Sequence, residues 1–287
     1  MEITSKFVNV ENIKIHYLEA GVGEQVVVLL HGGGLDNASL SWELLIPELT
    51  KYRRVVAPDL PGYGKSDKPD VVYDLNYYAQ FLPQFLKAVG IERADLVGIS
   101  MGGAISLGFV LNYPEQVGKL VLVDSYGLQR KSPFHKLSYL FVRIPGVRAL
   151  TFWSIKSHTM IRYSLKMILK RPGSVTDELV ERVYQQLMIP GVTRAFSDFQ
   201  NAELTWDGLK TVHIDRLGEI KAKTLIIHGG KDTLVPLAAS QEAHGLIQAS
   251  EMKIMEGCGH WPQRDNPKEF NQVVREFLIG GSGEEKS

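Results

Sequence analysis

The chain has 287 residues, about twice the ~150 residues of an average domain, which favours one large α/β domain with an insertion or two small domains. Its 44% hydrophobic and 22% charged residues exclude a disordered or fibrous chain. Lysine plus arginine and aspartate plus glutamate balance at 32 each, so no basic field is present to hold a phosphate backbone, and nucleic acid is not expected as a partner.

The cysteine content and the first residues indicate the compartment. Cys258 is the only cysteine, which excludes an internal disulfide and a thiolate zinc cluster and fits a reducing cytoplasm. The start of the chain lacks a basic segment followed by an apolar stretch, and the longest early apolar run, 26–30, is far below the ~20 residues that cross a bilayer. We therefore expect a cytoplasmic protein without membrane insertion.

Strands and helices alternate along the first third of the chain. The apolar pattern predicts strands over 7–10, 13–18, 25–30, 53–57, 95–99 and 119–123, and helices over 42–51, 73–89 and 101–112. Pro83 should kink or break the second helix. Repeated strand, helix, strand units of this length predict a mostly parallel sheet with helices on both faces.

The pattern changes over 126–211, where helical spacing dominates and no strand is indicated. Strands at 224–228 and 251–255 and helices at 237–246 and 267–278 then resume the alternation. The polar tail, 280–287, is expected to be disordered. The chain thus divides into a core of 1–125 and 212–279, a helical insertion of 126–211, and the tail.

A G-x-S-x-G pentapeptide, 98–102, lies between a predicted strand and a predicted helix. Such a turn holds its serine in a strained backbone conformation at the tip of the sheet, and glycines flank it because side chains there would collide with the neighbouring strand and helix. The pattern predicts Ser100 as a nucleophile.

A nucleophilic serine needs a base that a third group holds in place. His260 follows the last predicted strand in a glycine-rich loop, and Asp232 follows the preceding strand in a similar loop. The chain order Ser100, Asp232, His260 is nucleophile, acid, base, unlike the orders of chymotrypsin and subtilisin. We predict these residues as a catalytic triad, with Asp124, at the end of an earlier strand, as the alternative acid.

Three glycines follow His31 directly after the strand 25–30. In acyl transfer, backbone N–H groups stabilise the negative charge that develops on the carbonyl oxygen. We expect the N–H groups of Gly33 and Met101, with Gly34 as a substitute, to form this oxyanion hole. His31 itself is expected to fix the loop rather than to take part in the chemistry.

Two other patterns are set aside. The run 62–66 ends like a nucleotide-binding P-loop, but Asp59 stands where that motif requires its first glycine, so ATP is not expected. The sequence contains no H-E-x-x-H or other close ligand cluster, so neither a catalytic metal nor another cofactor is expected.

Together these motifs carry a family resemblance. The stretches 31–34, 59–66, 98–103, 228–232 and 257–262 resemble, in the same order, those of the α/β-hydrolase superfamily. The resemblance covers nearly all of the chain except the insertion. It implies an eight-stranded, mostly parallel sheet and a helical cap inserted after the sixth strand, where the sequence pattern breaks.

Within that superfamily, the His-Gly-Gly-Gly run, the Ser-Met-Gly-Gly elbow and the segment 217–224 resemble bacterial carbon–carbon hydrolases that cleave ring-fission products, and simple carboxylesterases share much of this. The carbon–carbon hydrolases generally carry Asn before the nucleophile, where this chain has Ile99. They also imply a cap arginine that holds the substrate carboxylate, and Arg182 lies in that region.

From these features we expect a serine hydrolase that cleaves carboxylic esters of small to medium acyl chains. The first alternative is a carbon–carbon bond hydrolase of meta-cleavage products, and the second is a small-molecule receptor of the same fold. Trp153, Arg182 and Trp206 of the insertion, with Trp261, are candidate substrate contacts. The sequence leaves open whether the protein is a homodimer.

Overall fold

The computed structural model describes residues 2–144 and 156–280 of the chain. One eight-stranded sheet runs through it in the order β1-β2-β4-β3-β5-β6-β7-β8. β1 and β4 pair with β2 in antiparallel orientation, and all other neighbours are parallel, as the sequence predicts. The strands are β1 (Thr4–Val10), β2 (Ile13–Ala20), β3 (Val26–Leu30), β4 (Arg54–Pro58), β5 (Ala94–Ile99), β6 (Val117–Val123), β7 (Lys223–Gly229) and β8 (Ser250–Met255).

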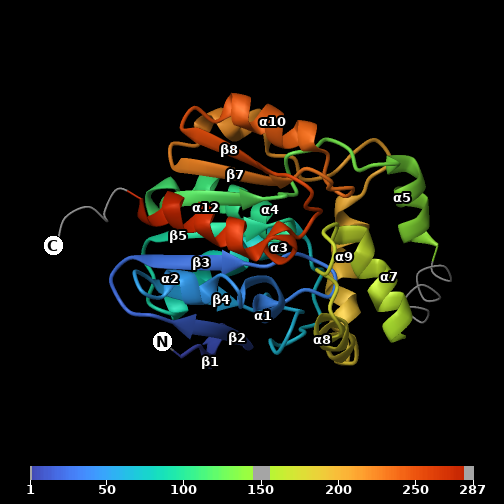
Figure 1. Cartoon of the computed structure of the whole chain (residues 1–287), viewed down its shortest axis with the longest axis horizontal. Helices are drawn as coiled ribbons and strands as arrows, with labels where there is room; N and C mark the ends of the chain where they lie inside the picture. Colours follow the sequence, from blue (N-terminus) through green and yellow to red (C-terminus); the bar gives the residue numbers. More distant parts are fainter. Residues whose placement is uncertain (1, 145–155, 281–287) are drawn as a thin grey trace.

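Helices cover both faces of the sheet (Figure 1). Successive residues of a strand point to opposite faces, so Leu96 of β5 packs in one buried cluster and Val97 in the other. This burial on both sides explains why the central strands are continuous apolar runs. The core helices are α1 (Ala38–Trp42), α2 (Ile46–Leu49), α3 (Leu75–Ala88), α4 (Met101–Asn112), α10 (Leu237–Leu246), α11 (Pro262–Asp265) and α12 (Pro267–Ile279), with 3₁₀ turns η1 (Pro114–Gln116) and η2 (Ile214–Glu219).

Two predicted helices differ from the structure. The helix expected over 42–51 is replaced by α1 and α2, because Asn37 caps α1 by accepting the Leu40 N–H at 2.8 Å and Pro47 begins a new helical turn. Pro83, expected to kink or break the helix over 73–89, does not break it, because it lies inside α3, which is one helix. Buried apolar residues on both sides of the proline hold the two turns against the same core.

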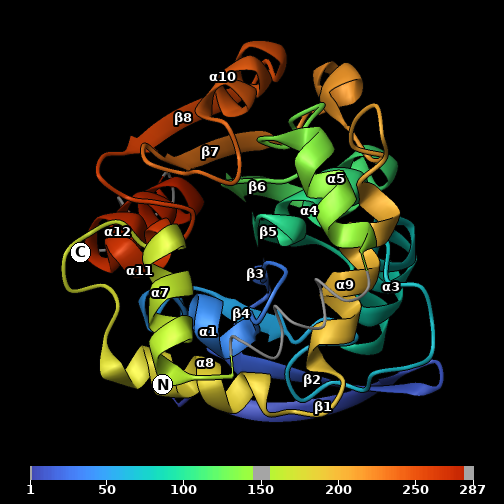
Figure 2. The same ribbon diagram turned by 90° about the vertical axis from the view of Figure 1, so that its right-hand side faces the viewer.

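Among the described residues of 126–211, four further helices lie between β6 and β7: α5 (His135–Arg143), α7 (His158–Ile168), α8 (Asp177–Leu187) and α9 (Val192–Glu203). Figures 1 and 2 show them gathered at one end of the sheet, and we call this region the cap. Among its described residues, the β pairing is a single bridge between Leu204 and Leu209. The expected disordered tail, except Gly280, lies outside the described residues.

Candidate active site

Ser100 stands at the turn between β5 and α4 with φ 51° and ψ −116°, a conformation that a residue with a side chain rarely adopts. Glycines make the turn feasible, because a Cβ on Gly98 would lie 2.4 Å from the Gly102 carbonyl oxygen and one on Gly102 would lie 2.2 Å from that of Leu30. The strained nucleophile turn expected from the sequence is therefore present in the backbone.

His260 and Asp232 come together from the loops after β8 and β7. The His260 Nδ1 lies 2.8 Å from the Asp232 Oδ2, and the Asp232 Oδ1 accepts the Leu234 N–H at 2.7 Å. Burial alone would raise the pKa of Asp232, but the hydrogen bond and charge of His260, with the Leu234 N–H, hold that pKa below its ordinary value. Asp232 is thus a carboxylate suited to orient the imidazole, whose Nε2 remains for proton transfer.

Asp124, the alternative acid, contacts Asp232 rather than His260. It follows β6, and its Oδ1 accepts the Gly229 N–H at 2.9 Å, while its buried Oδ2 has no hydrogen-bond donor among the described residues. Burial and the charge of Asp232 raise the pKa of Asp124 well above its ordinary value. A shared proton would satisfy both buried carboxyl groups, and the opposite directions of their pKa shifts favour Asp124 as the group that carries it.

His228 completes this buried group. Asp124, His228 and Asp232 each offer one side-chain oxygen or nitrogen atom that could bind a metal ion, and these three atoms lie within 4.8 Å of one another. The imidazole of His228 already has two protein partners, the Ser240 hydroxyl at 2.8 Å and the Val235 carbonyl at 3.2 Å, and burial lowers its pKa. These contacts fix a neutral ring that donates through Nε2 to the carbonyl and accepts through Nδ1 from the hydroxyl.

The glycine-rich loop after β3 is held by His31 and Asp36. The His31 ring donates from Nδ1 to the Gly32 carbonyl at 2.7 Å and accepts the Leu60 N–H at Nε2 at 3.0 Å, which is the structural role expected for it. Asp36 accepts the Gly32 N–H at 2.8 Å and the Ser41 hydroxyl at 2.6 Å. The loop therefore presents Gly33 to the site on a fixed backbone.

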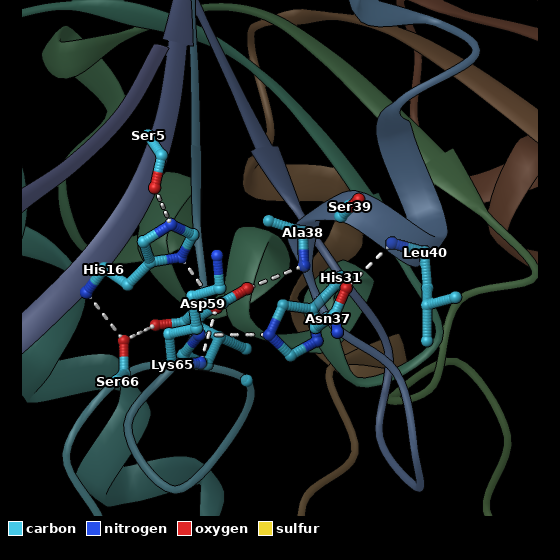
Figure 3. A network of polar contacts seen from close by, with 12 residues as sticks. Ser5, His16, His31, Asn37, Ala38, Ser39, Leu40, Asp59, Lys65 and Ser66 are labelled. Carbon is cyan, nitrogen blue, oxygen red and sulfur yellow. Dashed lines mark hydrogen bonds and ion pairs between the residues drawn. The ribbon is translucent and has the colours of Figure 1, made fainter. Parts of the chain in front are cut away.

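The adjoining loop, which the sequence likened to a P-loop, is organised by Asp59 (Figure 3). Its carboxylate accepts the Ala38 N–H at 2.9 Å, the Lys65 N–H at 2.8 Å and a hydrogen bond from the His16 Nδ1 at 2.8 Å. The hydrogen bonds from His16 and from the Lys65 N–H hold the pKa of the buried Asp59 carboxyl below its ordinary value, although burial alone would raise that pKa. The motif 59–66 thus serves to join the loop after β4 to β2 and α1.

A cavity of about 340 Å³ opens beside Ser100 and His260. Its walls are mainly apolar. They come largely from the loop 31–37 after β3, which we call the oxyanion loop, from the cap, and from the loop 256–261 after β8, which we call the histidine loop. The lining residues are Gly32, Gly33, Gly34, Leu35, Asp36, Ser100, Ile161, Ser164, Leu165, Ile168, Val183, Phe196, Leu234, His260 and Trp261. No lysine or arginine is among these described residues. Met101 begins α4 beside this wall, so its N–H belongs to the open end of a helix, as an oxyanion donor requires.

The predicted substrate contacts fall in different places. Trp261 lines the cavity, whereas Arg182 pairs with Glu43 and donates to the Ser39 hydroxyl at 2.9 Å and is not among the described lining residues. Trp206 is 46% exposed and packs edge-on against Tyr139, also away from the lining. Trp153 lies outside the described residues. Ile99, in the place of the expected Asn, is buried in the sheet core.

Two further residues shape the site: Phe196, which the sequence only groups with other cap aromatics as a candidate pocket residue, and Asp36, which sequence reasoning missed. Phe196 of α9 stands over the oxyanion loop, where a Cβ on Gly33 would lie 2.7 Å from its ring. Asp36 supports the same loop, and its position four residues after Gly32 is a local signal that could have suggested the contact. The orientation of Phe196 has no such signal, because helical spacing alone does not tell which apolar face meets the cavity.

Comparisons with known proteins agree with this fold. A family model described as the alpha/beta hydrolase fold matches residues 25–267. A 2-hydroxy-6-oxo-2,4-heptadienoate hydrolase of Pseudomonas putida is 32% identical over 93% of this chain and 93% of its own length. A 2-hydroxy-6-oxo-6-phenylhexa-2,4-dienoate hydrolase of Comamonas testosteroni is 34% identical over 96% of both chains.

Solved structures give the same result. A meta-cleavage product hydrolase from Pseudomonas fluorescens, CumD, superposes with a TM-score of 0.82 at 29% identity, covering 96% of this chain and 98% of its own. No helix of the described ranges is long and apolar enough to cross a membrane. This chain is a member of the α/β-hydrolase fold family, and within it is closely similar to the meta-cleavage product hydrolases.

Proposed function

We propose that this protein is a serine hydrolase that cleaves a carbon–carbon bond in a 2-hydroxy-6-oxo-dienoate, with Ser100, His260 and Asp232 as its catalytic triad. The observation that carries the proposal is similarity over nearly the whole chain to hydrolases named for such substrates, combined with Ser100 and His260 at one cavity. This corrects our preference for esters, since the relatives favour the alternative.

The chemistry of the substrate class explains what the site must do. Moving the 2-hydroxyl proton of such a dienoate to C5 gives a 2,6-dioxo acid with one remaining double bond. Attack on the C6 carbonyl then allows the C5–C6 bond to break, because its electrons delocalise into the 2-oxo acid. With one water consumed, the products are a carboxylic acid from C6 and a 2-hydroxydienoate.

Each proposed residue has a defined part in this reaction. Ser100 attacks C6 as His260 takes its proton, and Asp232 keeps the imidazole oriented and stabilises its positive charge. The N–H groups of Gly33 and Met101 receive the developing oxyanion. As the bond breaks, the protonated His260 gives its proton to the dienolate that leaves, and the neutral imidazole then activates the water that releases the carboxylic acid from Ser100.

Ester hydrolysis is the second candidate, and the cavity wall favours it. Among the described lining residues there is no lysine or arginine for a substrate carboxylate, and apolar walls suit an uncharged acyl chain. An ester needs the same triad, with the alcohol rather than a dienolate as the leaving group. The two reactions therefore differ in the substrate that the cavity accepts.

Paired kinetics would separate these candidates. We would measure kcat/KM for 2-hydroxy-6-oxohepta-2,4-dienoate and for p-nitrophenyl butyrate, in the unchanged protein and in Ser100→Ala. We expect the higher kcat/KM with the dienoate and loss of both activities in the variant. A higher value with the ester would make the protein an esterase. Failure of a small fluorophosphonate to label Ser100 would favour the receptor alternative.

A further inference from the structure

The short helix α11 begins two residues after His260 and ends at Asp265, which is only 6% exposed. The Asp265 Oδ2 accepts the Gly259 N–H at 2.7 Å. The same carboxylate accepts the Lys170 N–H at 2.9 Å and the Arg171 N–H at 3.0 Å. Asp265 thus accepts only backbone N–H groups in these contacts, and it accepts them from two segments that lie far apart in the sequence.

These two segments belong to different parts of the molecule. Gly259 immediately precedes His260 in the loop after β8, whereas Lys170 and Arg171 follow α7 in the cap. One buried carboxylate therefore joins the cap to the residue next to the proposed base. Hydrogen bonds to a carboxylate are stronger than those between neutral groups, so Asp265 holds the cap segment and the histidine loop firmly together.

Close packing at Gly259 also holds the histidine loop against the cap. A Cβ at this position would lie 2.2 Å from the Ile168 carbonyl oxygen of the cap. On the other side, a Cβ on Gly229 at the end of β7 would lie 1.9 Å from the Gly259 carbonyl oxygen. The backbone that leads into His260 is held between the cap and the sheet, and a small displacement of the cap segment 168–171 would move it.

We propose that Asp265 is a positioning residue for His260: it locks the histidine loop to the cap, so that the imidazole is aligned only when the cap segment 168–171 is docked. This inference rests on the proposed triad and holds for either substrate class. Asp265 is not among the described residues that line the cavity, so it acts through the loop and not on the substrate.

Another cap contact provides a matched control. Gln186 of α8 is also 6% exposed and also joins the cap to the core, because its Oε1 accepts a hydrogen bond from the Asn37 Nδ2 at 2.8 Å. Among the described residues, Gln186 forms no side-chain hydrogen bond with the loop 256–261 that carries His260, and it does not line the cavity. Gln186→Leu therefore loosens the cap without touching Gly259.

The two Asp265 variants differ in what they can accept. In Asp265→Asn the amide has one acceptor oxygen, so its NH₂ group must face either the Gly259 N–H or the cap N–H groups. Asp265→Glu keeps two carboxylate oxygens on a longer side chain. Because a displacement of about 1 Å at a catalytic group costs on the order of 10²-fold in rate, we expect a loss of that size for Asn and a smaller loss for Glu.

The test measures the rate at which a small fluorophosphonate labels Ser100, together with kcat and KM on the better substrate. We expect slow labelling and low kcat with little change in KM for Asp265→Asn, partial recovery for Asp265→Glu, and unchanged labelling for Gln186→Leu. Thermal unfolding establishes that each variant is folded, and if the Asn variant does not fold, the Glu variant alone must still label more slowly than the unchanged protein.

Three results would overturn the inference: unchanged labelling in Asp265→Asn, unchanged labelling in a folded Asp265→Glu when the Asn variant does not fold, or equal slowing in Gln186→Leu. The last result would assign the effect to general loosening of the cap. Failure of the proposed triad has a different signature, because the unchanged protein itself would then resist labelling.

Discussion

Exchanging Asp124 and Asp232 separately for Asn tests which buried carboxyl carries the charge. At position 124, Asn keeps an oxygen for the Gly229 N–H and supplies a permanent N–H donor in place of the shared proton. Its kcat should therefore stay near that of the unchanged protein. At position 232, Asn removes the charge beside the His260 Nδ1, and the corresponding change in a serine protease costs about 10⁴-fold in kcat.

The same change in Asp124 has a signature in stability. The raised pKa of Asp124 means that, between the unfolded pKa near ~3.9 and its higher folded pKa, the folded chain holds a proton that the unfolded chain has lost. The unchanged protein then loses about 1.4 kcal/mol of unfolding free energy for each pH unit in that interval because of this group. Asn has no such group, so the stability of Asp124→Asn relative to the unchanged protein should increase with pH.

Thermal unfolding from pH 4 to pH 8 and kcat at neutral pH would measure both effects. The assignment of the proton fails if Asp124→Asn loses as much activity as Asp232→Asn, since Asp124 would then be the ionised triad acid. It also fails if the stability difference between the variant and the unchanged protein does not depend on pH. A folded Asp124→Leu, which keeps neither polar contact, serves as the control for loss of packing.

Three further results are expected. Ser100→Ala should reduce kcat by about 10⁶-fold without unfolding the protein, judged by thermal unfolding, and a tenth of the activity remaining would refute the nucleophile. Chelators should leave kcat/KM unchanged, because the proposed triad uses no metal, and a requirement for added divalent metal would contradict the triad. Phe196→Ala should enlarge the cavity over Gly33 and favour bulkier acyl groups, and an unchanged ratio of kcat/KM between short and long substrates would exclude Phe196 as a determinant of size.

The sheet could be predicted because its sequence signals are local. Continuous apolar runs mark strands that are buried on both faces, and the helices expected over 101–112 and 237–246 match α4 and α10. The glycines around Ser100 are required by backbone contacts within one turn, so a short motif identifies them. The meeting of Asp232 with His260 follows from chain order, since parallel strands end at one edge of the sheet.

The remaining features depend on contacts between distant segments. Arg182 and Trp206 have the composition expected of a substrate site, but the first is paired with Glu43 and the second is partly exposed on the surface. The register of a cap helix against the core decides such outcomes, and periodicity does not fix that register. The role of Asp265 could not be predicted for the same reason, because its partners Lys170 and Arg171 lie 95 and 94 residues earlier in the chain.

The cap has two structural roles, lining the cavity and docking on the loop that carries His260, and Ile168 takes part in both. Ile161, Val183 and Phe196 form apolar walls of the cavity, so changes among them should alter substrate choice. The segment 168–171 docks on Gly259 and Asp265, so changes there should alter the reaction rate for every substrate. Contacts with the substrate are therefore expected from the walls, Ile168 included, and not from Lys170 and Arg171. Substrate range can vary through the walls only while the docking segment keeps His260 in place.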